Sequence, residues 1–292
     1  MPGVDGERVA EVAVVTGATS GLGREIALEL AQKRFRVVVV GRGSDRAAAA
    51  AREITAATAN PNIDPIGVED LARMSDVRRL ATTLVARYPR ISVLVNNAGG
   101  VFRRREVTTE GLERTFALNV LAPLLLTELL AEPLKAGAPS RVVNLSSAAH
   151  YRQQVPFENL QFTSGYSGFT VYGTSKLELL LLTRELGRRW AGTGVTVNAV
   201  HPGFVASGFG QNNGGGYGFT IRVLSKLFGR SIRRGAETPV LVATDPSLSS
   251  VTGAYFSDRR VRPGDPASQD LASAHRLYDA CEAILHPASA AG

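Results

Sequence analysis

Buried strands alternate with amphipathic helices in the hydrophobic pattern of this chain. Runs of consecutive apolar residues are typical of strands covered on both faces, and most are followed by helical apolar spacing, as at Leu22, Ile26 and Leu30. The predicted strands are RVAEVAVVTG, FRVVVVGR, NIDPIGVED, ISVLVNNAG, SRVVNLSS, GVTVNAVHPG and, near the end, GAYFSD. The predicted helices cover residues 21–34, 45–59, 75–88, 112–131 and 172–191.

This order of elements predicts an α/β fold. Strands that alternate with helices form βαβ units and a parallel sheet, and short right-handed connections favour a doubly wound open sheet. We expect a Rossmann-like, mostly parallel, seven-stranded sheet in a three-layer α/β/α arrangement. No linker interrupts the pattern, so a single domain is expected over residues 1–292. Within it, the glycine-rich residues 210–218 predict a mobile loop, and residues 286–292 predict a frayed tail.

The composition excludes several classes of protein. The net charge is +7, which would suit nucleic acid or an anionic ligand. The basic residues are spread along the chain without a nucleic-acid motif, so we expect no nucleic-acid partner. The single cysteine, Cys281, excludes an intramolecular disulfide, and the four histidines are scattered, so no metal site is predicted.

The apolar runs are too short to predict a membrane span. The longest, at 121–131 and 177–183, carry acidic residues, and a bilayer-spanning helix needs about 20 apolar residues. The first ten residues include Asp5 and Glu7 and lack the apolar region of a signal peptide. We therefore expect a protein without a membrane anchor.

A glycine-rich turn, TGATSGLG at 16–23, lies between the first strand and the first helix. Gly17 permits a sharp turn, and Gly21 and Gly23 let a phosphate approach the backbone and the helix N-terminus. A purely structural turn is the alternative. A P-loop is excluded here, because no Gly-Lys-Ser/Thr follows.

The end of the second strand indicates which dinucleotide would bind. An NAD site usually places an acid about 20 residues after the glycines, where it contacts the ribose hydroxyl. Here the strand ends at Val40-Gly41, and Arg42 follows. Arginine pairs with a 2′-phosphate, which an acid would repel. The pattern therefore favours NADP, and we expect Asp45 to cap the next helix.

A tyrosine and a lysine lie one helical turn apart in VYGTSK (171–176). Residues Tyr172 and Lys176 would share one face of a helix, which fits a solvated surface as well as an active site. A free tyrosine has a pKa of about 10, and a nearby ammonium lowers it. Tyr172 would then act as a general acid or base.

Six motifs in order resemble those of the short-chain dehydrogenase/reductase family. They are TGATSGLG, NNAG (96–99), the asparagine of ALNVLAP, NLSS (144–147), YGTSK and HPG (201–203), and the match covers about residues 9–285. The stretches VPFENLQ, YSGFTVYGTSK and GAYFSD are most similar to the retinol-dehydrogenase-like branch of that family.

The resemblance implies a catalytic set of Asn119, Ser147, Tyr172 and Lys176, with Ser146 as the alternative serine. Ser147 would donate a hydrogen bond to the substrate oxygen and Tyr172 would transfer the proton, while Lys176 would lower the pKa of Tyr172 and hold the nicotinamide ribose. The implied cofactor contacts are Gly17, Thr19, Ser20, Gly21, Leu22, Gly23, Arg42, Asp70, Leu71, Asn97, Ala98, Gly99, Tyr172, Lys176, Pro202, Gly203 and Val205.

A proline four residues after Asn119 interrupts the helical hydrogen bonds. Pro123 has no N–H, so the Asn119 carbonyl is expected to lack its usual donor. A water there would suit the family's proton relay from Lys176, whereas an ordinary proline kink is the alternative.

These features predict an NADP(H)-dependent oxidoreductase that transfers a hydride between nicotinamide and a carbonyl or alcohol of an apolar substrate. The alternatives are a catalytically silent nucleotide-binding or sensing protein and an epimerase or dehydratase. Residues 204–235 are rich in glycine and aromatic residues and are expected to cover the substrate. We also expect a cytoplasmic homodimer or homotetramer, formed through the helices at 112–131 and 172–191.

Overall fold

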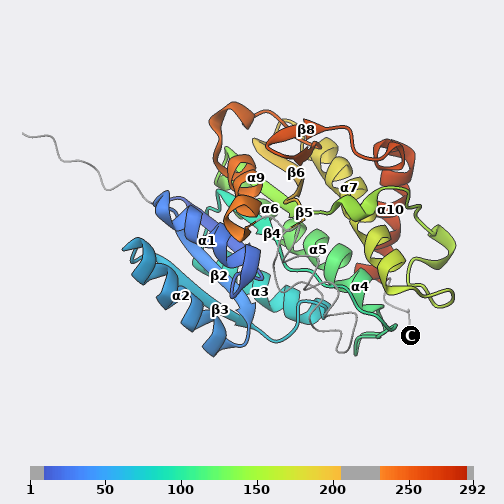
Figure 1. The fold of residues 1–292 in the computed structure, drawn as a ribbon, viewed down its shortest axis with the longest axis horizontal. Coiled ribbons are helices and arrows are strands. Elements are labelled where there is room, and N and C mark those ends of the chain that lie inside the picture. The colour runs from blue at the N-terminus through green and yellow to red at the C-terminus, as the bar shows by residue number, and fades with distance from the viewer. Residues whose placement is uncertain (1–9, 205–230, 288–292) are drawn as a thin grey trace, which may run out of the picture.

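One sheet lies at the centre of the molecule. The computed structural model describes residues 10–204 and 231–287, and their strands form a single sheet in the order β3-β2-β1-β4-β5-β6-β7-β8 (Figure 1). The strands from β3 to β7 are parallel to their neighbours, and β8 is antiparallel to β7. Their bounds are β1 Val12–Thr16, β2 Arg36–Arg42, β3 Ile63–Val68, β4 Val93–Asn96, β5 Ser140–Leu145, β6 Val195–His201, β7 Tyr255–Ser257 and β8 Arg260–Arg262.

Helices cover both faces of the sheet. Alternate strand residues point to opposite sides, and both sets are apolar, so each face needs a covering layer. Ala13 and Val15 of β1 belong to one half of the core, and Val12 and Val14 belong to the other. The first half is covered by α1 Gly21–Gln32, α2 Ser44–Thr58 and α9 Ile232–Thr244. The second is covered by α3 Met74–Arg87, α5 Ala122–Leu129, α6 Ala131–Ala136, α7 Gly168–Arg189 and α10 Leu271–Leu285. The predicted doubly wound α/β/α fold is confirmed.

The strand order reverses between β1 and β4, which are neighbours in the sheet. Connections from these two strands leave in opposite directions, so a crevice opens beyond their carboxyl ends. Ligands of doubly wound sheets bind at this point. The glycine turn follows β1 and the NNAG motif ends β4, so the fold brings both motifs to the crevice.

The predicted elements differ from the structure at the edge of the sheet and in one helix. An eighth strand, β8, follows the seven expected strands. All three of its residues are exposed, so no apolar run marks it. The expected helix at 112–131 is divided into α4 Arg114–Phe116, a π-helix over Ala117–Leu121 (η1), and α5. In η1 the Ala122 N–H bonds to the Ala117 carbonyl, five residues back. The widened turn lies directly before Pro123, which has no N–H to donate.

The starts of two helices also differ from expectation. Gly43, with a positive φ of 75°, is the N-cap of α2, and Asp45 lies in the first helical turn. Asp45 is therefore not the cap, although its negative charge still suits the helix dipole there. Helix α7 begins at Gly168, one turn before the expected start. Among the described residues, no helix has both the length and the apolar character that membrane crossing requires.

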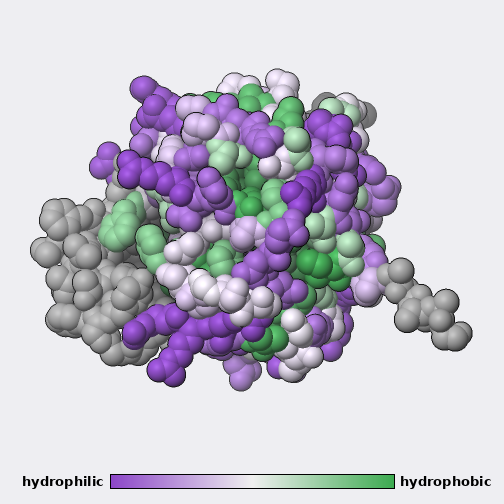
Figure 2. All heavy atoms as spheres, turned by 90° about the vertical axis from the view of Figure 1, so that its right-hand side faces the viewer, coloured by the Kyte–Doolittle hydropathy of each residue, from purple (hydrophilic) through white to green (hydrophobic). Residues whose placement is uncertain are grey.

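Helix α10 packs along α7 of the same chain (Figure 1). Leu277 and Cys281 of α10 are fully buried in the same core cluster as Leu181 of α7. The Arg189 guanidinium lies 3.7 Å from the centroid of the Tyr278 ring. Figure 2 views the side of the molecule that carries α10, where hydrophilic residues predominate between smaller apolar patches. The prediction of a homodimer or homotetramer rested on the apolar runs of two helices, and the run in α7 has a partner within one chain.

An acidic pair lies where α10 meets α5. The Tyr278 hydroxyl donates a hydrogen bond to Glu128 Oε1, and the Glu282 carboxyl also interacts with Glu128. Burial, followed by the Glu282 carboxyl, raises the pKa of Glu128 to about 7. Glu128, Glu282 and the exposed His286 also bring possible metal-ligating atoms within 4.8 Å of one another. The seam between α5 and α10 is therefore sensitive to protonation.

We expect Glu128→Gln to remove a pH-dependent loss of stability. As pH rises from about 4.5 to about 7, the unfolded carboxyl ionises while the folded one keeps its proton, so the wild-type free energy of unfolding falls. The variant should be more stable than the wild type by about 1–2 kcal/mol at pH 8. This difference is smaller than the full pKa shift implies, because the side chain is partly exposed and its charge is screened. The difference should vanish near pH 4.5. Urea unfolding at both pH values measures it, with the exposed Glu132→Gln as control. Parallel curves for wild type and Glu128→Gln would contradict the assignment.

Candidate active site

The glycine turn after β1 is packed against the end of β4. The Asn97 side-chain amide donates to the Thr16 carbonyl (2.8 Å), and the Asn97 backbone N–H donates to Thr16 Oγ1 (3.0 Å). Gly17 has a φ of 66°. A Cβ on Gly23 would lie 2.3 Å from Asn97 Nδ2 and 2.4 Å from the Gly17 carbonyl oxygen. Gly23 is thus required for close packing, and Asn97 holds the turn in place.

The start of α1 offers uncapped backbone donors. Its N-cap, Ser20, makes no side-chain cap hydrogen bond in the described part of the chain, and the first turn holds no acidic residue. The first N–H groups of a helix have no partner within the helix and carry partial positive charge. A phosphate fits this position, with Gly21 (φ 56°) and Leu22 beside it.

Arg42 is placed next to this turn. The Ala18 N–H donates to the Val40 carbonyl (2.9 Å), and a Cβ on Gly41 would lie 2.0 Å from Thr19 Cγ2. The turn therefore rests directly on the end of β2, where the exposed Arg42 is the last strand residue. This arrangement fits a nucleotide that carries a phosphate on its adenosine ribose.

Ser147, Tyr172 and Lys176 meet beyond the end of β5. The Ser147 side chain hydrogen-bonds to Tyr172. The Lys176 ammonium donates to the Leu145 carbonyl (2.9 Å) and lies 5.7 Å from the centre of the Tyr172 ring. Ser146, the alternative serine, is buried and donates its hydroxyl to the Lys176 carbonyl (3.1 Å). Of the two serines, Ser147 is therefore the one that faces the tyrosine.

Asn119 connects this group to the NNAG motif. Its side chain is fully buried, accepts from the Gly100 N–H (2.9 Å), and donates to the Gly100 carbonyl (2.9 Å) and to Ser175 Oγ (3.0 Å). A Cβ on Gly99 would lie 3.1 Å from Asn119 Oδ1 and 3.5 Å from Lys176 Nζ. Gly99 thus sits between these two side chains. The water relay at the Asn119 carbonyl stays a prediction.

The electrostatics of the tyrosine differ from the expectation. Burial raises the pKa of Tyr172 to about 12, and the hydrogen bond from Ser147 opposes this rise. Burial lowers the pKa of Lys176 to about 8. The prediction that Lys176 brings the pKa of Tyr172 below 10 is wrong for this structure. Desolvation dominates, because both polar groups lie in a site of low polarity.

Asp70 forms an ion pair with Arg114, which the sequence analysis did not identify as a site residue. Arg114 Nη2 lies 2.8 Å from Asp70 Oδ2, and the Asp70 Oδ1 accepts from the Ala72 N–H (3.0 Å). Leu71 and Ala98 line a small cavity beside the Asp70 loop. Arg114 gave no signal, because an arginine before an apolar helix is equally typical of a solvated surface.

A chain of buried amides and hydroxyls was also missed. Asn96 Nδ2 donates to Asn144 Oδ1 (2.8 Å) and to Thr127 Oγ1 (3.1 Å), and Asn144 Nδ2 donates to Thr183 Oγ1 (2.9 Å). All four residues are buried. The chain links β4 and β5 to α5 and to α7, and α7 carries Tyr172 and Lys176. The sequence did contain one indication of this chain, because Asn96 and Asn144 each lie near the end of a buried apolar strand.

The predicted nicotinamide segment is described only in part. Pro202 and Gly203 (φ 84°) directly follow β6 at the same edge of the sheet. His201 Nδ1 accepts from the Ala148 N–H (3.3 Å), in keeping with a structural role. Val205 and most of the expected substrate cover at 204–235 lie outside the described residues, and from Ile232 onward the chain belongs to α9.

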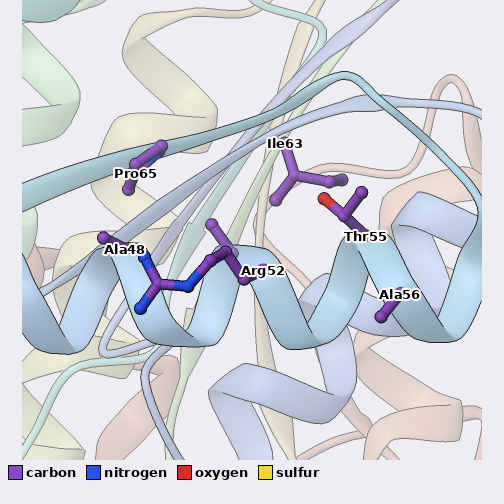
Figure 3. A pocket seen from close by; sticks show the side chains of 7 residues that line it. Ala48, Arg52, Thr55, Ala56, Ile63 and Pro65 are labelled. Carbon is purple, nitrogen blue, oxygen red and sulfur yellow. The ribbon is translucent and has the colours of Figure 1, made fainter.

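An open groove lies away from these residues. It has a volume of about 370 Å³ and is formed by residues of α2 and β3 at the edge of the sheet, as Figure 3 shows. Alanines of α2 and the side chains of Ile63 and Pro65 make it apolar, and Arg52 also lines it. It contains none of the predicted site residues.

The chain is similar to known dehydrogenases over most of its length. The family profile described as short chain dehydrogenase matches residues 11–216. Human retinol dehydrogenase 13 is 36% identical over 270 residues, covering 91% of this chain and 81% of that protein. Mouse retinol dehydrogenase 12 is 38% identical over 278 residues, covering 94% and 86%.

Solved structures show the same fold. An uncharacterised protein from Mycobacterium paratuberculosis has a TM-score of 0.75 and 28% identity, covering 94% of this chain and 93% of that one. A blue fluorescent protein from a metagenomic library, solved with NADPH, has a TM-score of 0.67 and 27% identity, covering 89% and 98%.

Proposed function

This chain belongs to the short-chain dehydrogenase family, and we propose that it is an NADP(H)-dependent oxidoreductase that interconverts a carbonyl group and an alcohol on an apolar substrate. Membership of the family makes it a dehydrogenase or reductase. The observation that carries the proposal is the meeting of Ser147, Tyr172 and Lys176 beside Gly99.

The residues have complementary roles in reduction of a carbonyl. The nicotinamide, when bound, supplies the hydride. Ser147 donates a hydrogen bond to the oxygen on which negative charge develops. Tyr172 transfers a proton to that oxygen, and its pKa of about 12 keeps the phenol protonated at neutral pH, as a general acid requires. Lys176, held by the Leu145 carbonyl, keeps a positive charge near this proton donor.

An apolar substrate is supported by the relatives and by the surroundings of the site. Two relatives are named retinol dehydrogenases. Phe169, three residues before Tyr172 on α7, is exposed, and Tyr151 is exposed four residues after Ser147. We propose a bulky apolar aldehyde, ketone or alcohol, a retinoid among them.

A screen of NADPH oxidation over carbonyl compounds of increasing size tests the activity and the substrate class together. We expect the highest kcat/KM for long apolar compounds. Best turnover of small polar aldehydes would contradict the substrate class. NADPH binding without turnover of any compound would instead support the silent nucleotide-binding protein.

The preference for NADPH should depend on Arg42. We expect NADPH to bind more tightly than NADH, and Arg42→Ala to reduce that preference by roughly 10–150-fold, the equivalent of one charge-assisted hydrogen bond of about 1.5–3 kcal/mol. Fluorescence titration of each variant with both cofactors measures it. Arg52→Ala is the control, since Arg52 lines the groove between α2 and β3. Equal affinities in the wild type would refute the assignment of NADP.

The organisation of the protein in the cell stays a set of predictions. We propose one domain over the whole chain, a cytoplasmic location, and a homodimer or homotetramer. Light scattering at micromolar concentration tests the last of these, and fractionation without detergent tests the location. A monomer would agree with the packing of α10 against α7.

A further inference from the structure

His150 is a buried histidine three residues after Ser147, in the short helix Ala148–His150 (η2). Its imidazole bridges two segments that are far apart in sequence. Nδ1 lies 2.6 Å from the Ser147 carbonyl oxygen, and Nε2 lies 3.2 Å from the Asp265 backbone nitrogen. The side chain therefore connects the segment after β5 to the segment after β8.

The two hydrogen bonds define the tautomer. A backbone N–H only donates, so the Asp265 N–H makes Nε2 the acceptor. Nδ1 then carries the proton and donates to the Ser147 carbonyl. A neutral ring is required, and burial lowers the pKa of His150 below its ordinary value. The imidazole is thus a fixed bridge, not a group that exchanges protons with the substrate.

Several further contacts hold the ring and its partner. The ring packs edge-on against Tyr255 of β7, with centroids 5.0 Å apart at 76°. The Arg152 N–H donates to Asp265 Oδ2 (2.9 Å), a second bond between the same two segments. Gly264 has a φ of 77°, and a Cβ there would lie 2.8 Å from Ser268 Oγ. The backbone turn that leads into Asp265 therefore favours glycine at this position.

Ser147 receives the effect of this bridge. Its carbonyl is bound by His150, while its hydroxyl accepts from the Ala149 N–H (3.2 Å) and reaches Tyr172. The Ser147 backbone is extended, with φ −153° and ψ 152°, at the point where β5 passes into η2. A shift of the Ser147 backbone would carry the hydroxyl away from the tyrosine. A hydrogen bond to the Ser147 carbonyl opposes that shift.

We propose that His150 is a positioning residue, whose Nδ1–H holds the Ser147 peptide and so directs the Ser147 hydroxyl toward Tyr172 and the substrate oxygen. The proposal rests on the proposed function. The Asp265 N–H, which donates to Nε2, then helps to orient the His150 ring, although the Asp265 segment contributes no reacting group.

The two ring nitrogens are separable by substitution. In His150→Asn, the amide takes the place of Nδ1–H and keeps the bond to Ser147. In His150→Gln, the longer side chain reaches Asp265 and loses Ser147, and His150→Phe keeps the ring and loses both bonds. We expect kcat within a few-fold of wild type for Asn, and roughly 10–100-fold lower for Gln and Phe, as for a misplaced catalytic group. NADPH affinity should stay within two-fold in all three.

The measurements are kcat, KM, NADPH titration and Tm for each variant. A merely structural role would make kcat follow Tm, with no rescue by asparagine. Wild-type kcat in folded Gln and Phe variants, or equal losses in all three, would overturn the proposal. Tyr172→Phe is measured in parallel. If the wild type turns over no carbonyl compound, the proposed function fails. If Tyr172→Phe keeps its turnover, Tyr172 is not the proton donor. If Tyr172→Phe loses turnover and the His150 variants do not, only the role of His150 fails.

Discussion

Tyr172→Phe is expected to lower kcat by about 10²–10⁴-fold and to leave NADPH affinity almost unchanged. The substitution removes one oxygen, the proton donor, and keeps the ring that lies 5.7 Å from the Lys176 ammonium. Loss of a positioned general acid has an effect of this size. Because the interaction acts in the transition state, kcat and kcat/KM should fall together.

Steady-state reduction of the best carbonyl compound, with a separate NADPH titration, checks this result. Tyr88→Phe is the matched control, since the Tyr88 hydroxyl donates to Asp64 Oδ2 (2.7 Å) and neither residue belongs to the proposed site. A Tyr172→Phe enzyme with ordinary kcat would remove Tyr172 from the mechanism and favour another proton donor.

Lys176→Met should damage turnover and cofactor binding at once. The ammonium lies within reach of Tyr172 and Gly99 and is held by the Leu145 carbonyl. We expect kcat/KM to fall by at least about 10²-fold, and NADPH affinity by about tenfold if Lys176 makes one charge-assisted contact to the cofactor. Lys135→Met is the control, because Lys135 forms an exposed ion pair with Glu132. Undiminished NADPH affinity would limit Lys176 to its effect on Tyr172.

Lys176→Met also tests the lowered pKa of Lys176, through the pH dependence of the free energy of unfolding. Burial lowers the folded pKa of Lys176 from 10.5 to about 8. Between pH 8 and 10.5 the folded amine is neutral while the unfolded one keeps its proton, so the wild-type free energy of unfolding should rise with pH, by about 3 kcal/mol in all. Lys176→Met should lack this rise. The measurement uses protein without cofactor, and identical pH profiles would contradict the shifted pKa.

The sequence predicted the layers of the fold and seven of the strands well, because buried parallel strands have a strong signature. The strands β1 and β2 are almost continuous valine, and both strands and the intervening helix were located. The exposed β8 could not be predicted, since an edge strand needs no apolar face. The π-helix was only half predicted. Pro123 signalled a break in the hydrogen bonds, but the form of the break depends on packing around Asn119.

Within the site, the sequence predicted which residues come together, but it did not predict their pKa values. The i, i+4 spacing correctly placed Tyr172 and Lys176 on one helix. The family resemblance pointed to Ser147, whose side chain hydrogen-bonds to Tyr172. Their pKa values depend on how far each group is removed from water, which sequence does not contain. The bridge from His150 to Asp265 was missed for a similar reason, because 115 residues separate the partners. Only the folded chain brings them together.

The position of α10 has a consequence for biosynthesis. Of the described helices, it is the last to leave the ribosome, and it buries the outer side of α7 through Leu277 and Cys281. Until residues 271–285 emerge, the leucines of that side are exposed to other nascent chains and to chaperones. The site residues of β4, β5 and α7 are all synthesised earlier. The part of the chain that carries the proposed site residues is therefore synthesised with an apolar surface still exposed, and that surface is covered only when α10 follows.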